Sequence, residues 1–179
     1  MTAAPEYLPH YTYDDYLHWE GRWELIDGIP VAMSPAPVPE HQWVAGNVHA
    51  EFRTALKKAI CPFKVYQPLD YKLSDDTVFQ PDLLVVCEPI TKKYLDFPPF
   101  IVAEILSETT RLRDRNVKFP RYESERIPYY LMIDPAGRTV EIYQFAEGRY
   151  RRQPFEQSQP YQFVSDKCHV ELVFDAIWD

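Results

Sequence analysis

The sequence is poor in glycine and has no long apolar run. It holds 5 glycines against 17 prolines, so we expect proline to shape most turns. No stretch approaches the roughly 18 consecutive apolar residues of a membrane-spanning helix. The first ten residues, MTAAPEYLPH, lack the basic start and apolar core of a signal peptide. These absences predict no membrane segment and a cytoplasmic location.

Cysteine is also scarce. Cys61, Cys87 and Cys168 are odd in number and widely separated, and their spacing fits no zinc site. We therefore expect three reduced thiols, as is usual for a cytoplasmic protein.

An excess of basic residues is missing as well. The chain has 19 Lys and Arg residues against 27 Asp and Glu residues, which gives a net charge of -8. This balance argues against a protein that coats nucleic acid through bulk positive charge, but it allows a local basic groove. The 46% hydrophobic and 15% aromatic content is typical of a globular protein. The length suits one domain over residues 1–179.

The pattern of apolar residues predicts an α/β fold. Thr12 followed by Asp15 predicts a short helix to about Trp19, and WELIDGIPVAM predicts a hairpin that turns at Asp27-Gly28. Helical spacing predicts amphipathic helices over residues 41–58 and, with more charge, about 111–126. Strands are expected at residues 63–67, 69–73, 79–87, 100–106, 129–134, 139–145, 149–155 and 169–174. Together these predict a mixed β-sheet flanked by helices.

Two acidic residues stand inside otherwise apolar strands. Asp82 follows Pro81 in FQPDLLVVCE, and Glu104 lies within FIVAEIL. A carboxylate costs several kcal/mol to desolvate unless it is paired or bound to a metal. If the two strands are neighbours, both carboxylates can point into one pocket, and Lys118 follows on the next helix.

Two carboxylates and an ammonium group are suited to metal-assisted phosphodiester hydrolysis. Carboxylate oxygens hold Mg²⁺, and the metal lowers the pKa of a bound water. A lysine can stabilise the negative charge of the transition state.

Three segments carry a resemblance to a known family: WELIDGIPVAMSPAPVPEHQ, QPDLLVV and VAEILSETTRLRDRNVKFPRYESERIPYYLMIDP. The chain resembles the Uma-type restriction endonucleases of the PD-(D/E)XK nuclease superfamily. The resemblance implies a restriction-endonuclease-like fold and a metal-dependent endonuclease that acts on DNA. It also implies Mg²⁺ as cofactor, with Mn²⁺ as a substitute, and a homodimer.

The resemblance assigns the catalytic residues position by position. Asp82 matches the first acid of the motif and Glu104 the second, so these two would bind the metal. The lysine normally found two residues after the second acid is absent, because Leu106 stands there. Lys118 matches a lysine displaced to the following helix. Glu24, in WELIDG, matches an acidic position that would assist the site.

Other positions carry weaker indications. His41, in PEHQ, matches a recurrent polar position and is a candidate accessory residue. Pro120 departs from the pattern, since it removes a backbone donor close to Lys118, so the helix either begins near Asn116 or is distorted. The locally basic run RLRDRNVKFPR predicts contacts to the DNA backbone, for which the candidates are Arg111, Arg113 and Arg115.

Each assignment has a plainer alternative. Asp82 can cap backbone donors at a strand end, and Glu104 can be an ordinary salt-bridged residue. Glu24 can be an outward residue of an alternating hairpin, and Lys118 a solvated helix lysine. The basic run can be a solvated helix face with ion pairs. The alternative function is a non-catalytic module that binds nucleic acid or protein and keeps the nuclease fold.

Overall fold

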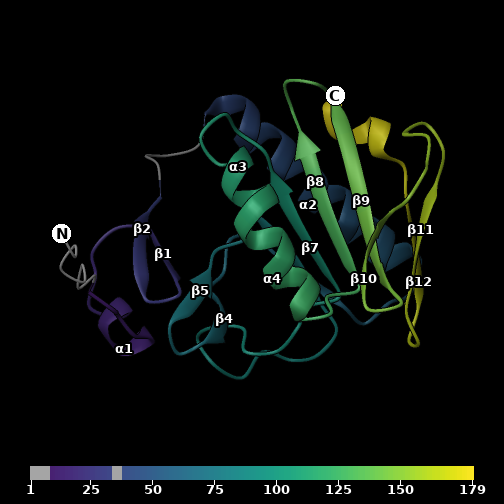
Figure 1. Cartoon of the computed structure of the whole chain (residues 1–179). Helices are drawn as coiled ribbons and strands as arrows, with labels where there is room; N and C mark the ends of the chain where they lie inside the picture. Colours follow the sequence, from purple (N-terminus) through teal and green to yellow (C-terminus); the bar gives the residue numbers. More distant parts are fainter. Residues whose placement is uncertain (1–8, 34–37) are drawn as a thin grey trace.

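The computed structural model describes residues 9–33 and 38–179. Its centre is a six-stranded sheet with the order β10-β9-β8-β7-β6-β3 (Figure 1). Only β7 and β8 run parallel; the other neighbours are antiparallel. The strands are β3 (Lys64–Tyr66), β6 (Leu83–Val86), β7 (Ile101–Ile105), β8 (Tyr129–Asp134), β9 (Thr139–Ala146) and β10 (Arg149–Arg152). This mixed sheet confirms the predicted α/β class.

Helices cover both faces of the sheet. Helix α2 (Pro39–Lys58) lies behind it in Figure 1, and the segment α3 to α4 lies in front. Side chains alternate along each strand, so Leu83 of β6 packs in the core on the α2 side. Its neighbour Leu84 packs against Tyr122 of α4 (Phe119–Ser124) on the other side. The predicted amphipathic helix over residues 41–58 is therefore confirmed.

A second sheet of four strands, in the order β2-β1-β5-β4, carries the predicted hairpin. Its strands are β1 (Trp23–Ile26), β2 (Ile29–Ala32), β4 (Tyr71–Ser74) and β5 (Thr77–Phe79). Asp27 and Gly28 have φ values of 49° and 75°, as a tight two-residue turn requires. Near this sheet the short helix α1 (Tyr13–Tyr16) confirms the predicted start at Thr12 but ends earlier than expected.

The single strand predicted over residues 79–87 is wrong. Strand β5 ends at Phe79 and β6 begins at Leu83, and the two belong to different sheets. Pro81 lies between them and has no backbone N–H to donate to a ladder. The break leaves Asp82 at the junction of the two sheets. A strand that was not predicted, β11 (Tyr161–Val164), pairs with β12 (His169–Leu172).

The charged helical segment is continuous but distorted, which was one of the two predicted outcomes. Helix α3 (Arg111–Arg113) leads into a π-helical turn, η1 (Asp114–Lys118), and then into α4. The N–H of Phe119 donates to the carbonyl of Asp114, five residues earlier. Pro120 follows in the first turn of α4, where a missing donor is tolerated. The wide turn therefore accommodates the proline without ending the helix.

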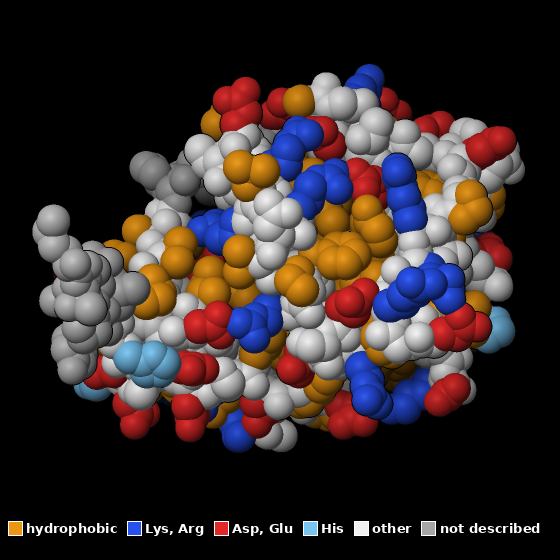
Figure 2. Space-filling view, viewed as in Figure 1, with side chains coloured by type: hydrophobic (Ala, Val, Ile, Leu, Met, Phe, Trp, Pro, Cys, Tyr) orange, Lys and Arg blue, Asp and Glu red, His pale blue; other side chains and the backbone are white. Residues whose placement is uncertain are grey.

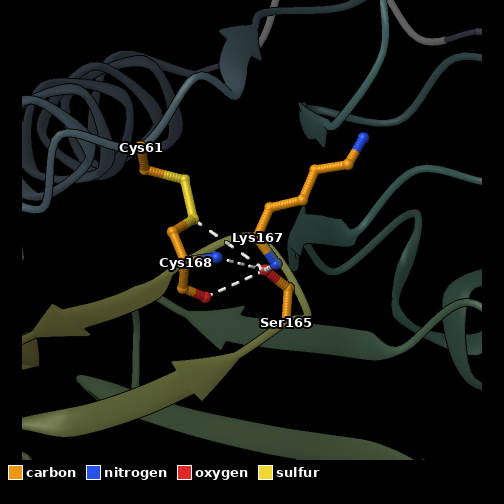
Figure 3. Close-up of a disulfide and its surroundings, with 4 residues drawn as sticks. All are labelled: Cys61, Ser165, Lys167 and Cys168. Atoms are coloured by element: carbon orange, nitrogen blue, oxygen red, sulfur yellow. Dashed lines mark hydrogen bonds between the residues drawn. A yellow bond between two sulfur atoms is a disulfide. The ribbon is translucent and has the colours of Figure 1, made fainter.

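The prediction of three reduced thiols is wrong for two of the cysteines. Cys61 and Cys168 form a disulfide across 107 residues (Figure 3), and Cys87 is free. The bond links the end of α2 to the start of β12. A separation this large gives no sequence signal, because only the fold brings the two residues together. The predicted cytoplasmic location was based partly on reduced thiols, and disulfides are rare in reducing compartments. The cysteines therefore do not support that location.

A 3-10 helix, η2 (Phe174–Trp178), packs against the α2 side of the core. In the described ranges, no helix combines the length and apolar character needed to cross a membrane.

Candidate active site

A pocket of about 360 Å³ opens where the four-stranded sheet, the start of α2 and the helix after β7 meet. Asp82, Glu104, Lys118 and His41 all line it. The remaining lining residues are Arg22, Met33, Val38, Gln80, Ser107, Thr109, Thr110, Arg113 and Asp114. The fold therefore brings both predicted metal ligands and the predicted lysine into one cavity.

Strand pairing explains why the two acids meet. Leu83 of β6 lies opposite Ala103 of β7 in an antiparallel pair. Asp82 and Glu104 are the next residues outward in this register, so they fall on the same face of the sheet. That face is the one covered by the helix that carries Lys118.

Asp82 faces a histidine and a backbone donor. Its Oδ2 accepts a hydrogen bond from the N–H of Ile105 at 2.8 Å and lies 3.3 Å from Nε2 of His41. Burial disfavours the charged imidazole, but hydrogen bonding to Asp82 and its negative charge outweigh burial and raise the pKa of His41. The predicted accessory histidine is therefore a direct partner of the first acid.

Glu104 and Lys118 form a buried ion pair. The Nζ of Lys118 donates to Oε1 of Glu104 at 2.9 Å, and each residue is 2% exposed. The hydroxyl of Tyr122 donates to the same oxygen at 2.8 Å. Burial raises the pKa of Glu104, although Lys118 opposes that shift. Tyr122 was not predicted as part of the site, because an aromatic residue on a helix normally indicates core packing.

Glu24 holds Lys118 from the hairpin side and is fully buried. Its Oε1 accepts from Nζ of Lys118 at 2.8 Å and from the N–H of Gln80 at 3.0 Å. Its Oε2 lies 3.4 Å from Nε of Arg113. Glu24 is absent from the lining of the pocket, so it contacts the lysine rather than the open cavity.

Asp114 is a site residue that the sequence reasoning missed. It is 1% exposed, lines the pocket, and lies 3.6 Å from Nζ of Lys118 through its Oδ1. The signal was available, because residues four apart share a helix face. Burial raises the pKa of Asp114.

Lys118 is thus surrounded by three buried carboxylates: Glu24, Glu104 and Asp114. Burial alone would disfavour the ammonium, but the three negative charges outweigh burial and raise the pKa of Lys118. The lysine therefore stays charged at neutral pH. A second cation, the guanidinium of Arg113, lies 3.4 Å from Glu24 in the same cluster.

The three predicted DNA-contacting arginines divide into two groups. Arg111 pairs with Asp134 at 2.9 Å, and Arg115 pairs with Glu141. Only Arg113 lines the pocket. Figure 2 shows Lys and Arg side chains interspersed with hydrophobic ones over the face on which α3 and α4 lie.

The pocket fits a hard divalent cation with few protein ligands. Within residues 9–33 and 38–179 no cluster of three His, Cys, Asp or Glu side chains is suited to hold a metal. Over the same residues, Oδ1 of Asp82 and Oε2 of Glu104 make no recorded hydrogen bond. Mg²⁺ is commonly held by one or two carboxylates and completes its octahedron with water and substrate oxygens. Asp82 and Glu104, which line the same cavity, match that preference.

Buried polar atoms without a hydrogen-bond partner gather around this pocket. Four of the seven such side-chain atoms in the described residues belong to Glu24, His41, Arg113 and Asp114. Native proteins satisfy nearly all buried polar groups, and exceptions mark sites that bind something or do chemistry.

Comparison with known proteins identifies the family and the fold. The model of the Uma2 family, described as "Putative restriction endonuclease", matches residues 13–171. A curated protein of Synechocystis sp., "Uncharacterized protein slr1290", is 26% identical over 148 residues, which cover 79% of this chain and 76% of that protein. A crystal structure described as "a putative nuclease belonging to DUF820", from Anabaena variabilis, superposes with a TM-score of 0.73 at 18% identity. The superposition covers 93% of this chain and 97% of that one, and it confirms the predicted restriction-endonuclease-like fold.

Proposed function

We propose that the chain, which belongs to the Uma2 restriction endonuclease family, is a Mg²⁺-dependent DNA endonuclease. Membership of this family indicates a nuclease. The observation that carries the proposal is the convergence of Asp82, Glu104 and Lys118 in one pocket from three different segments: the residue before β6, strand β7 and η1. Each of the three has a structural alternative when taken alone. Their meeting at one cavity is what metal-assisted hydrolysis requires.

Asp82 and Glu104 would supply oxygen ligands to the metal ion. When bound, Mg²⁺ supplies a water of lowered pKa and offsets charge on the scissile phosphate. The N–H of Ile105 orients Asp82, and Tyr122 orients Glu104. These fixed donors leave one oxygen of each carboxylate directed to the pocket.

Lys118 would stabilise the negative charge that develops on the phosphate in the transition state. Glu24 and Asp114 act through it as positioning residues, because both contact its ammonium. His41 lies beside Asp82 and would act through it as a positioning residue. Nothing in this role requires His41 to bind metal.

The alternative function is a binding module that kept the fold without catalysis. It is favoured by the three carboxylates that surround the Lys118 ammonium, since Glu24 and Glu104 then engage it within the protein. Incubation of purified protein with supercoiled plasmid separates the two functions. Nicking with Mg²⁺ or Mn²⁺ that stops with EDTA and is lost in Glu104→Gln supports catalysis, and no nicking of any DNA form supports the module.

We also propose that residues 1–179 form a single domain that works as a homodimer, so that two sites can face two strands. The family model matches residues 13–171 as one unit. Sedimentation equilibrium tests the dimer, with one species at twice the 21.2 kDa chain mass as the expected result.

A further inference from the structure

We infer that Arg22 and Arg113 form a two-armed clamp for the phosphates that flank the scissile one. The inference rests on the proposed nuclease function and specifies which basic groups hold the substrate backbone. Arg22 precedes β1, whereas Arg113 ends α3, so the two reach the same pocket from different walls.

Among the described residues, the guanidinium of Arg113 contacts a carboxylate only through Nε. Its Nε lies 3.4 Å from Oε2 of the buried Glu24 and makes no hydrogen bond within the described residues. The side chain is 18% exposed, so the stem is largely buried and fixed. Within the same described residues, its two terminal nitrogens have no recorded protein partner. A planar guanidinium anchored in this way presents paired donors that match two oxygens of one phosphate.

Arg22 carries a charge that no carboxylate neutralises among the residues described. It contacts only the neutral side-chain oxygen of Gln80, at 3.4 and 3.5 Å. The amide nitrogen of Gln80 donates to Asp70 at 2.8 Å and to the hydroxyl of Tyr16 at 3.1 Å. Those bonds fix the amide so that its oxygen faces Arg22. Arg22 is therefore oriented without being paired, which leaves its full charge for an anionic ligand.

The neighbouring arginines lack these properties. Arg111 and Arg115 lie on the same helical segment, but their terminal nitrogens bond Asp134 and Glu141, whereas Arg113 contacts Glu24 through Nε. Neither lines the pocket. Of the three arginines predicted to contact the DNA backbone, only Arg113 is therefore retained, and Arg22 is added. Arg111 and Arg115 serve as matched controls.

A phosphate contact has a thermodynamic signature that a structural role does not reproduce. Each neutralised phosphate releases counterions, so log K falls with log salt with a slope of about 0.9 per contact for duplex DNA and about 0.7 for single strands. The clamp therefore predicts that removing either arginine lowers the absolute salt slope by the value of one phosphate contact, roughly 0.7–0.9.

The experiment measures DNA affinity of the full chain by fluorescence anisotropy in EDTA, over a series of NaCl concentrations. The probes are a labelled 20-mer duplex and the corresponding single strand. Arg22→Gln and Arg113→Gln should each reduce the salt slope by roughly 0.7–0.9 and weaken binding roughly fivefold to tenfold at 0.1 M salt. Arg22→Lys and Arg113→Lys should restore most of the slope, because each keeps a point charge. Arg111→Gln and Arg115→Gln should keep the wild-type slope.

The outcomes separate this inference from the proposed catalysis. A wild type that binds with the predicted slope pattern but never cleaves supports the clamp and overturns the endonuclease. A wild type that cleaves while Arg22→Gln and Arg113→Gln keep its slope overturns the clamp only. Equal slope losses in all four glutamine variants, or no DNA affinity in the wild type, also overturn the clamp. Thermal melts show whether each variant is folded, so that a reduced salt slope is not mistaken for the result of unfolding.

Discussion

Replacing Lys118 by methionine removes the ammonium that contacts three buried carboxylates. Glu24, Glu104 and Asp114 would then face one another inside the protein. Breaking a buried ion pair by removing one partner costs about 3–5 kcal/mol, because the remaining charge is buried without compensation. Methionine has a similar length, so the packing loss is small. We therefore expect Lys118→Met to lose about 3–5 kcal/mol of the free energy of unfolding at pH 7.

The loss should depend on pH with a definite sign. Burial raises the pKa of Glu104 in the folded state, and removing Lys118 removes the group that opposes this rise. A carboxyl whose folded pKa exceeds its unfolded pKa stabilises the fold fully below the unfolded pKa, and this stabilisation is lost as pH rises through the folded pKa. The difference between wild type and variant should therefore be smaller at pH 5 than at pH 7.

Urea and thermal denaturation at both pH values measure this effect. For a domain of this size, about 2–4 °C is lost per kcal/mol, so Tm should fall by about 6–20 °C at pH 7. Lys92→Met removes the exposed pair with Asp96 and should leave stability nearly unchanged. Adding Glu24→Gln to Lys118→Met should recover part of the loss. A Lys118→Met protein as stable as wild type at pH 7, with no pH dependence of the difference, would refute the reasoning.

Three further predictions concern the metal, the disulfide and the hairpin. Mg²⁺ should raise Tm of the wild type because it binds the folded state; Asp82→Asn should abolish this rise, and Asp134→Asn, which lies outside the pocket, should keep it. Cys61→Ser should lower stability by about 2–5 kcal/mol, and dithiothreitol should then lower Tm of the wild type but not of the variant. Gly28→Ala should destabilise the protein, since φ is 75° and the new Cβ would lie 2.3 Å from the His10 ring; an unchanged Tm would contradict the strain.

Local patterns predicted most of the elements, because they are encoded in short stretches of chain. The hairpin followed from Asp27-Gly28, and α2 followed from its helical spacing of apolar residues. Strand β8 coincides with its predicted bounds. The strand prediction failed at Pro81. Residues 79–87 read as a single apolar run, but the run contains parts of two short strands that belong to different sheets.

Long-range pairings could not be predicted in the same way. The disulfide joins Cys61 to Cys168 across 107 residues, and no local pattern reports such a contact. Whether an arginine faces a pocket or a partner acid also depends on the fold. Arg111 pairs with Asp134, which lies on β8, whereas Arg113 contacts Glu24 and lines the cavity.

The candidate site was partly predictable because a buried acid in an apolar strand is costly. That cost identified Asp82 and Glu104, and the antiparallel register brings them together. Asp114 was missed because charged residues on a helix are usually solvated. Its burial depends on the π-helical turn, which the sequence indicates only through Pro120.

The initial rate of plasmid nicking by wild type and Lys118→Met, with Mg²⁺ and at a temperature where both are folded, tests the central claim most directly. An ammonium that acts in the transition state affects turnover more than metal or DNA affinity. The account predicts a loss of about 10²–10³-fold in rate, by analogy with the removal of one oxyanion-hole donor. Nicking by Lys118→Met at the wild-type rate would contradict it.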